Sequence, residues 1–189
     1  VTSKVNEGSL FTFTISFKKN IQSDNKSTSA LCSYKDKFPL KGLKVHPDLE
    51  ITTFATEPML QNPTNIDIDS KGRIWVLEAY NYRPAITGNP SNPAGDKILI
   101  LEDTNGDGAA DSRKIFYQSP DLNAPLGIAV LDSMVIVPQS PYMWKMFDDN
   151  RDGKADRKEI LFQGIGGEQH DHGAHAFVFG PDGKLYFNF

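Results

Sequence analysis

The chain has 189 residues and a formal net charge of −4, with 39% hydrophobic and 23% charged residues, which is the composition of an ordinary globular protein. No basic patch stands out, which argues against nucleic acid as a partner, and no apolar run reaches the ~18–20 residues of a membrane span. A single cysteine, Cys32, excludes an intrachain disulfide.

The first 41 residues differ from the rest of the chain. Phe13, Ile15 and Phe17 alternate with threonine and serine, and this period of two predicts a half-buried strand. A polar stretch follows it. We treat residues 1–41 as an N-terminal extension to which the sequence assigns no role.

From Leu43 onward the chain consists of short apolar runs separated by turn residues, with no helical periodicity. Two rounds of hairpin, strand, acidic loop and strand are followed by the start of a third round. The expected strands are 50–56, 65–69, 73–78, 97–102, 113–118, 127–131, 134–138, 142–147, 158–163, 175–179 and 184–188.

Four strands per round, repeating at roughly 45–60 residues, predict an all-β fold, a partial β-propeller of four-stranded blades. About two and a half blades fit into residues 43–189, whereas a ring needs at least about four. We therefore expect this region to be the N-terminal part of a propeller truncated at the C-terminus, with strand 50–56 as the outer strand of the missing last blade. Apolar residues of the inner strands should pack blade on blade: Ile66, Ile68, Ile74, Val76, Ile128, Val130, Val135, Val137, Phe177, Phe179, Leu185 and Phe187.

The acidic loops are two copies of one pattern, D-x-N-x-D-G-x-A-D, separated by 45 residues. Their side-chain oxygens stand at positions 1, 3, 5 and 9, and calcium prefers six to eight oxygen ligands. Glu159 occupies position 12 of the second loop, where the first has Lys114. The pattern favours a structural calcium site over a solvated turn, with these ligands: Asp103, Asn105, Asp107, Asp111, Asp148, Asn150, Asp152, Asp156 and Glu159.

A second candidate site lies just before the strand predicted at 175–179. Three of the four histidines of the chain, His170, His172 and His175, gather there with Asp171. Imidazole is the usual general base near neutral pH, so a catalytic or substrate-binding role is favoured. A transition-metal site and a loop of solvated histidines remain alternatives. The long insertion at 79–96 is also a candidate for function.

Three segments carry a resemblance to a known family: NPTNIDIDSKGRIWVLEAYNYR (62–83), DKILILEDTNGDGAAD (96–111) and GIGGEQHDHGAHAFVFGPDGKLYFNF (164–189). They resemble a membrane-bound dehydrogenase family of planctomycetes and verrucomicrobia, whose propeller is similar to those of sorbosone and soluble glucose dehydrogenases. In those sugar dehydrogenases a histidine eight positions before G-P-D-G acts as general base toward pyrroloquinoline quinone. The resemblance gives this role to His172.

The resemblance implies a quinone-dependent dehydrogenase that oxidises a sugar or alcohol, passes electrons to an acceptor such as a cytochrome c domain, and resides in the periplasm or outside the cell, in association with a membrane. Haem c would belong to C-terminal parts outside this sequence, and the fragment alone would be inactive. The alternatives are a non-enzymatic, calcium-stabilised propeller that binds a glycan or a protein, and a calcium-dependent hydrolase of lactone type.

Overall fold

The computed structural model describes residues 13–17, 44, 46–88, 90–164 and 173–188. Over these residues the protein is almost entirely antiparallel β-structure, as predicted, and the single-turn helix α2 (Pro84–Thr87) interrupts the long insertion. None of the helices described is long and apolar enough to cross a membrane. The strands are β1 (Phe13–Phe17), β2 (Leu49–Thr53), β3 (Pro63–Ile68), β4 (Ile74–Glu78), β5 (Lys97–Glu102), β6 (Ser112–Gln118), β7 (Ala129–Leu131), β8 (Met134–Gln139), β9 (Tyr142–Phe147), β10 (Arg157–Gln163), β11 (His175–Phe179) and β12 (Leu185–Asn188).

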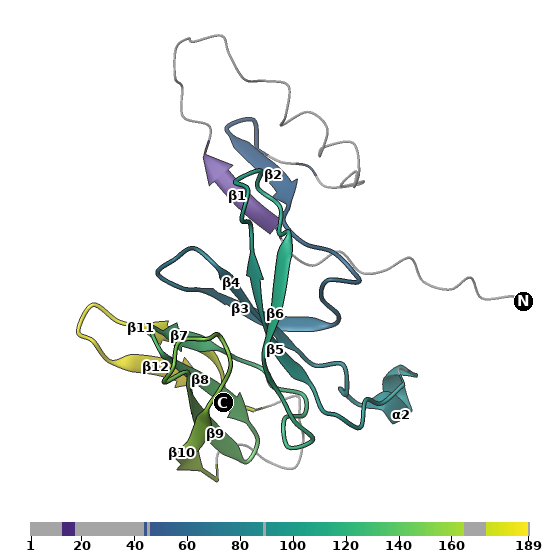
Figure 1. Cartoon of the computed structure of the whole chain (residues 1–189), viewed down its shortest axis with the longest axis vertical. Helices are drawn as coiled ribbons and strands as arrows, with labels where there is room; N and C mark the ends of the chain where they lie inside the picture. Colours follow the sequence, from purple (N-terminus) through teal and green to yellow (C-terminus); the bar gives the residue numbers. More distant parts are fainter. Residues whose placement is uncertain (1–12, 18–43, 45, 89, 165–172, 189) are drawn as a thin grey trace, which may run out of the picture.

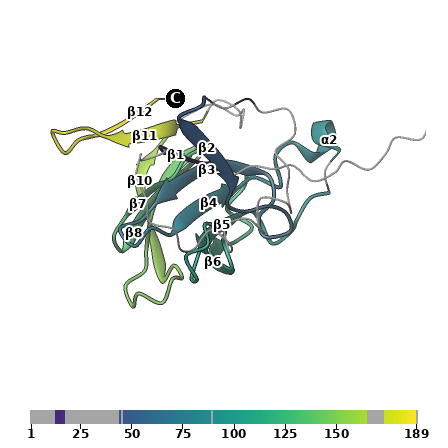
Figure 2. The same cartoon turned by 90° about the horizontal axis from the view of Figure 1, so that it is seen from above.

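These strands form two four-stranded sheets and two strand pairs (Figure 1). The first sheet has the order β3-β4-β5-β6 and the second β7-β8-β9-β10, so both are simple meanders. β1 pairs with β2, and β11 pairs with β12. Both views place α2 and the β11–β12 hairpin on opposite sides of the molecule (Figures 1 and 2).

The sheets pack face to face in chain order. Trp75, Leu77 and Ile98 of the first sheet share a buried cluster with Val135 and Val137 of the second. The opposite face of the first sheet is covered by the segment after β2, which buries Phe54, Ala55 and Leu60. The opposite face of the second sheet is covered by the β11–β12 hairpin, through side chains that include Phe177, Leu185 and Phe187.

The first strands of successive sheets run in the same direction, side by side. Near the start of β3, Thr64 Oγ1 donates to the carbonyl oxygen of Pro125 at 2.8 Å. Three residues further along β3, Asp67 Oδ2 accepts the N–H of Val130 at 2.7 Å. A Cβ on Gly127, two residues before β7, would lie 3.2 Å from the Cα of His175, the first residue of β11, so the start of β11 lies against the start of the second sheet. The two contacts of β3 show that the two four-stranded sheets are stacked in the same orientation.

Three of the apolar residues expected to pack between blades are exposed instead. Ile66 and Ile68 are 42% and 58% exposed, and Phe179 is 44% exposed. Along β3, Asn65 and Asp67 face the second sheet, so the two isoleucines point the other way. The segment after β2 covers that face over β4 and β5 but leaves β3 open, and Phe179 lies at the turn end of its hairpin.

Candidate functional site

The two Asp loops join the third and fourth strands of their sheets and close in the same way. The N–H of Asp111 donates to the Glu102 carbonyl at 3.0 Å, and that of Asp156 to the Phe147 carbonyl at 2.8 Å. Each loop also docks onto the preceding layer through an alanine. Ala110 donates its N–H to the Phe54 carbonyl at 2.8 Å, and Ala155 donates to the Phe116 carbonyl at 2.9 Å. The loops therefore link adjacent layers.

Within the first Asp loop, the carboxylates accept hydrogen bonds from the backbone of the loop itself. Asp103 accepts from the N–H groups of Gly106 (2.7 Å), Asp107 (3.2 Å) and Gly108 (2.8 Å). Desolvation raises the pKa of this carboxyl, but the Gly108 and Gly106 N–H groups outweigh it and hold the pKa of Asp103 below its ordinary value. Asp111 instead accepts from the N–H and hydroxyl of Thr104.

The second Asp loop repeats this arrangement with one difference. Asp148 Oδ2 accepts the N–H of Gly153 at 2.9 Å, while Asp148 Oδ1 is buried and has no hydrogen-bond partner. In the first loop the corresponding oxygen accepts two N–H groups. The described part of the chain holds no group of three or more His, Cys, Asp or Glu side chains placed to bind a metal ion. The predicted ligands are thus close in sequence but turned toward the backbone.

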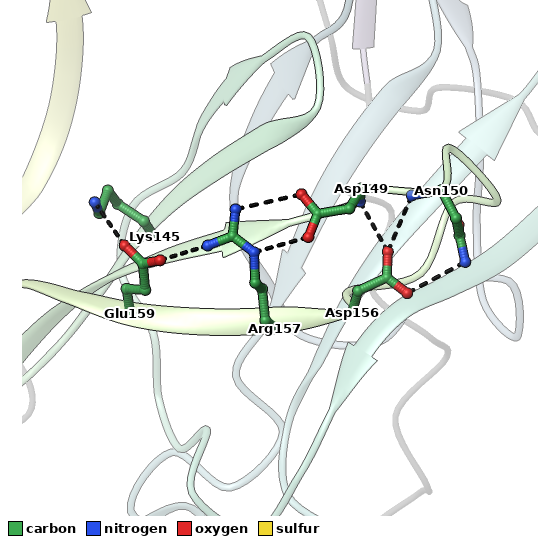
Figure 3. A network of polar contacts seen from close by, with 6 residues as sticks. All are labelled: Lys145, Asp149, Asn150, Asp156, Arg157 and Glu159. Atoms are coloured by element: carbon green, nitrogen blue, oxygen red, sulfur yellow. Dashed lines mark hydrogen bonds and ion pairs between the residues drawn. The ribbon is translucent and has the colours of Figure 1, made fainter.

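Glu159 is not brought to the other ligands predicted for the second loop. Figure 3 shows Arg157 between Glu159 on one side and Asp149 on the other, while Asp156 accepts hydrogen bonds from the backbone of Asp149 and from Asn150. Glu159 also pairs with Lys145 at 3.0 Å. The hydrogen bond from Lys145 is the main cause of its lowered pKa. Its role as a calcium ligand stays a prediction.

Of the histidine cluster, the structure describes His175; His170, Asp171 and His172 lie outside the described residues. His175 begins β11 and is half-buried, with Nδ1 2.7 Å from the carbonyl oxygen of Gly173. This contact orients the ring and leaves Nε2 as its second polar atom. In a meander the connections alternate between two ends, so the start of β11 lies at the same end as the long loop between β4 and β5, opposite the Asp loops.

A buried ion pair stands where the long loop leaves and re-enters the first sheet. Glu78, at the end of β4, and Lys97, at the start of β5, are 1% and 16% exposed and lie 3.3 Å apart. Glu78 Oε1 also accepts the N–H of Gln61 at 2.7 Å. Burial raises the pKa of Glu78, although the Gln61 N–H and Lys97 act in the opposite direction.

Asp96 fixes the long loop to the connection between β6 and β7. Its side chain is buried and accepts the N–H groups of Asn81 at 2.9 Å and Ala124 at 2.6 Å. Asn81 in turn donates to the Asn123 side chain at 3.0 Å. Burial raises the pKa of Asp96 against these hydrogen bonds. Neither buried acid was assigned a role from the sequence, although Glu78 directly precedes the insertion 79–96 and Asp96 is its last residue.

A second repeat in the sequence agrees with the prediction that strand 50–56, which contains most of β2, is an outer strand. Residues 53–68 match residues 115–130 at an offset of 62, with a shared phenylalanine, leucine and isoleucine and two shared prolines. The backbone agrees, because Asn62 and Ala124 both have a positive φ, 46° and 49°. The pairs are Phe54/Phe116, Pro58/Pro120, Leu60/Leu122, Pro63/Pro125 and Ile66/Ile128.

Comparison with known proteins gives a family without an assigned activity. No curated protein and no solved structure matches the chain. A family model described as "Domain of unknown function (DUF7133)" matches residues 36–189, which covers both four-stranded sheets, both Asp loops and the segment with the histidines. The chain therefore belongs to the DUF7133 family.

Proposed function

We propose that the stacked sheets are blades of a β-propeller and that this propeller is a dehydrogenase of the quinoprotein type, acting on a sugar or alcohol. The blade interpretation is supported by two four-stranded meanders in the same orientation with their first strands side by side. In such a ring the first strands line the axis. His175 begins one of them, and this placement is the observation that carries the proposal.

In this proposal His172 would accept the proton of the substrate hydroxyl, and pyrroloquinoline quinone, when bound, would supply the hydride-accepting chemistry. His170, Asp171 and His175 orient the base or the substrate, and His175 is already held by its contact with Gly173. No residue of this chain is assigned to the quinone. A periplasmic or extracellular location and a cytochrome c acceptor follow from the same resemblance.

Replacing His172 with Ala should lower quinone-dependent dye reduction by ~10²–10⁴-fold, because a general base typically contributes that much. The measurement is dye reduction with pyrroloquinoline quinone and a panel of sugars and alcohols, using the longest form of the protein that can be produced. His46→Ala is the matched control, since His46 is exposed and distant in sequence from the cluster. Full turnover in His172→Ala would contradict the assignment.

Calcium is proposed as a structural ion of the Asp loops, and the buried, unpaired Asp148 Oδ1 favours the second loop. Calcium at 100 times its dissociation constant should add about 2.7 kcal/mol to the free energy of unfolding, because it binds only the folded protein. Asp152→Ala should reduce this gain more than Asp107→Ala. Thermal melts in calcium and in chelator measure it, and equal melting temperatures in the two buffers would exclude the ion.

The alternative function, a propeller that binds a glycan or a protein without catalysis, is favoured by one observation. The carboxylates described in the Asp loops are engaged by backbone N–H groups, which is the arrangement of a structural linker. If quinone and dyes support no turnover while calcium still stabilises the protein, the binding module replaces the dehydrogenase.

A further inference from the structure

The two Asp loops differ in the residue that follows their asparagine. Asn105 is followed by Gly106 in the first loop, and Asn150 is followed by Arg151 in the second. The backbone conformations are alike, because Gly106 and Arg151 have positive φ values of 78° and 61°. Asn105-Gly106 is the only asparagine–glycine step in the sequence. The first loop therefore places an asparagine next to a residue without a side chain.

An asparagine before a glycine is open to attack by its own backbone. The nitrogen of the next residue bonds to the side-chain amide carbon and closes a five-membered succinimide ring, from which ammonia leaves. A Cβ on that next residue crowds the approach, and glycine has none. At Gly106 a Cβ would meet nothing within 4 Å, and residues 104–108 are exposed. The ring therefore has room to close, and water has access to it.

Hydrogen bonds within the first loop are placed to promote this attack. Asn105 Oδ1 accepts the N–H of Asp107 at 2.9 Å. This donor polarises the amide carbonyl and points at the oxygen on which negative charge develops during the attack. The N–H of Gly106 donates to Asp103 Oδ1 at 2.7 Å, so a carboxylate stands at the proton that the attacking nitrogen must lose. Both the amide and the nitrogen that attacks it thus have a partner in place.

The second loop lacks part of this arrangement. Asn150 Oδ1 accepts the N–H of Asp152 at 2.9 Å, as in the first loop. Asp148 Oδ1, however, has no hydrogen-bond partner, so it does not receive the next N–H as Asp103 Oδ1 does. Figure 3 shows that the amide nitrogen of Asn150 donates to Asp156, at 3.2 Å. The group that would leave as ammonia is therefore held in place.

Arg151 adds a further obstacle in the second loop. Its Cβ crowds the backbone nitrogen that would attack. Its guanidinium pairs with Asp132 at 2.8 Å, so a backbone rotation that closes the ring would disturb this ion pair. Gly106 carries neither restraint. The two loops thus form a natural pair in which one asparagine is poised to react and the other is protected.

We propose that Asn105 is a site of spontaneous deamidation and that Asn150 is protected from it. The Gly106 nitrogen bonds to Asn105 Cγ and passes its proton through Asp103. The bond between Cγ and Nδ2 breaks, and the amide nitrogen takes up this proton and leaves as ammonia. Water then opens the succinimide at either carbonyl, which leaves aspartate or isoaspartate at position 105. Water is the only co-reactant, and nothing is oxidised or reduced.

The product would alter the first loop alone. Isoaspartate adds a methylene to the backbone at position 105, which displaces the N–H groups of Gly106 and Asp107 from their acceptors. Either product also adds a negative charge beside Asp103. Because Ala110 donates its N–H to the Phe54 carbonyl, the change weakens the link between this loop and the layer before it. The inference rests on the geometry of the loops and not on the propeller, the dehydrogenase or calcium.

The test is ageing of the 189-residue chain in mildly alkaline buffer with a chelator, followed by tryptic mapping with mass spectrometry. Asn105 and Asn150 fall in different tryptic peptides, 98–113 and 146–151. We expect the first peptide to gain the mass of –OH in place of –NH2 and to elute as two products. This loss of amide should be at least about tenfold faster than in the second peptide, a difference of about 1.4 kcal/mol between the two barriers.

Two reciprocal variants test the cause of this difference. Gly106→Arg places the residue of the second loop in the first and should slow the loss at Asn105 to the rate at Asn150. Arg151→Gly should raise the rate at Asn150, and it decides the matter if circular dichroism shows that Gly106→Arg does not fold. An unchanged rate in a folded variant overturns the inference.

A synthetic peptide of residues 98–113, aged in the same buffer, is the control for the effect of the fold. If this peptide loses its amide while Asn105 of the chain keeps it, the fold protects the site and the inference is overturned. Equal rates at Asn105 and Asn150 in the unmodified chain overturn it as well. None of these readouts depends on activity, so failure of the dehydrogenase proposal would leave them unchanged.

Discussion

Replacing Lys97 with Met is expected to lower the free energy of unfolding by about 3–5 kcal/mol, which is the usual cost of breaking a buried ion pair. Glu78 is 1% exposed, and Lys97 is the cation that pairs with it. Methionine keeps the length and the apolar contacts of the lysine stem, so the loss comes from the charge. Urea unfolding at a fixed protein concentration measures it.

Two further variants separate charge from packing. Lys145→Met removes one of the two cations that pair with Glu159, where the side chains of Lys145 and Glu159 are 27% and 49% exposed, and should destabilise the protein far less than Lys97→Met because solvent screens an exposed pair. The double variant Lys97→Met/Glu78→Gln should recover most of the stability, because no unpaired charge is then buried. A double variant as unstable as Lys97→Met would show that packing, and not charge, is responsible.

The loss in Lys97→Met should also depend on pH. Burial raises the pKa of Glu78 above its ordinary value and Lys97 opposes that shift, so the variant should have a still higher folded pKa. When the pKa of a carboxyl is higher in the folded than in the unfolded protein, the group stabilises the fold at pH values below its pKa in the unfolded protein. This stabilisation is lost as the pH rises through its pKa in the folded protein. The variant should therefore approach wild-type stability as pH falls toward 4.5, the ordinary value of this group.

The sequence predicted the strands well because each is short, apolar and bounded by turn residues. The predicted bounds of β5, β9 and β11 agree with the structure at both ends. The prediction failed for the packing of Ile66 and Ile68, because alternation shows that a strand has an apolar face and not whether a neighbour covers it. The same ambiguity applies to Phe179.

The candidate site was only partly accessible to sequence reasoning. Residue spacing identified the Asp loops, but it could not show that Asp103 is turned toward its own backbone or that Glu159 pairs with Arg157 and Lys145. The buried pair of Glu78 and Lys97 joins residues 19 positions apart across strands β4 and β5. Only the register of the sheet brings them together. The repeat at offset 62 was readable from the sequence, and it agrees with the prediction of strand 50–56 as an outer strand.

Gly95→Ala is expected to destabilise the protein by more than about 4 kcal/mol, which is exceptional for a single methyl group. Gly95 has a φ of 85°, and a Cβ there would lie 1.7 Å from the carbonyl oxygen of Ser119 and 2.4 Å from its carbonyl carbon. Both are backbone atoms, so no side chain can move aside. The two segments would have to separate, which would disturb Asp96 next in the chain and its hydrogen bond to Ala124.

Gly88→Ala is the control that separates the steric overlap with Ser119 from the energetic cost of placing an alanine in a left-handed backbone conformation. Gly88 has a φ of 73°, and a Cβ there would meet nothing within 4 Å, so this variant should lose only the ~1–2 kcal/mol of a left-handed alanine. Urea unfolding of both variants at one protein concentration gives the difference. Equal losses would mean that the long loop moves away from Ser119 at little cost, and the fixed attachment of this loop through Asp96 would then be wrong.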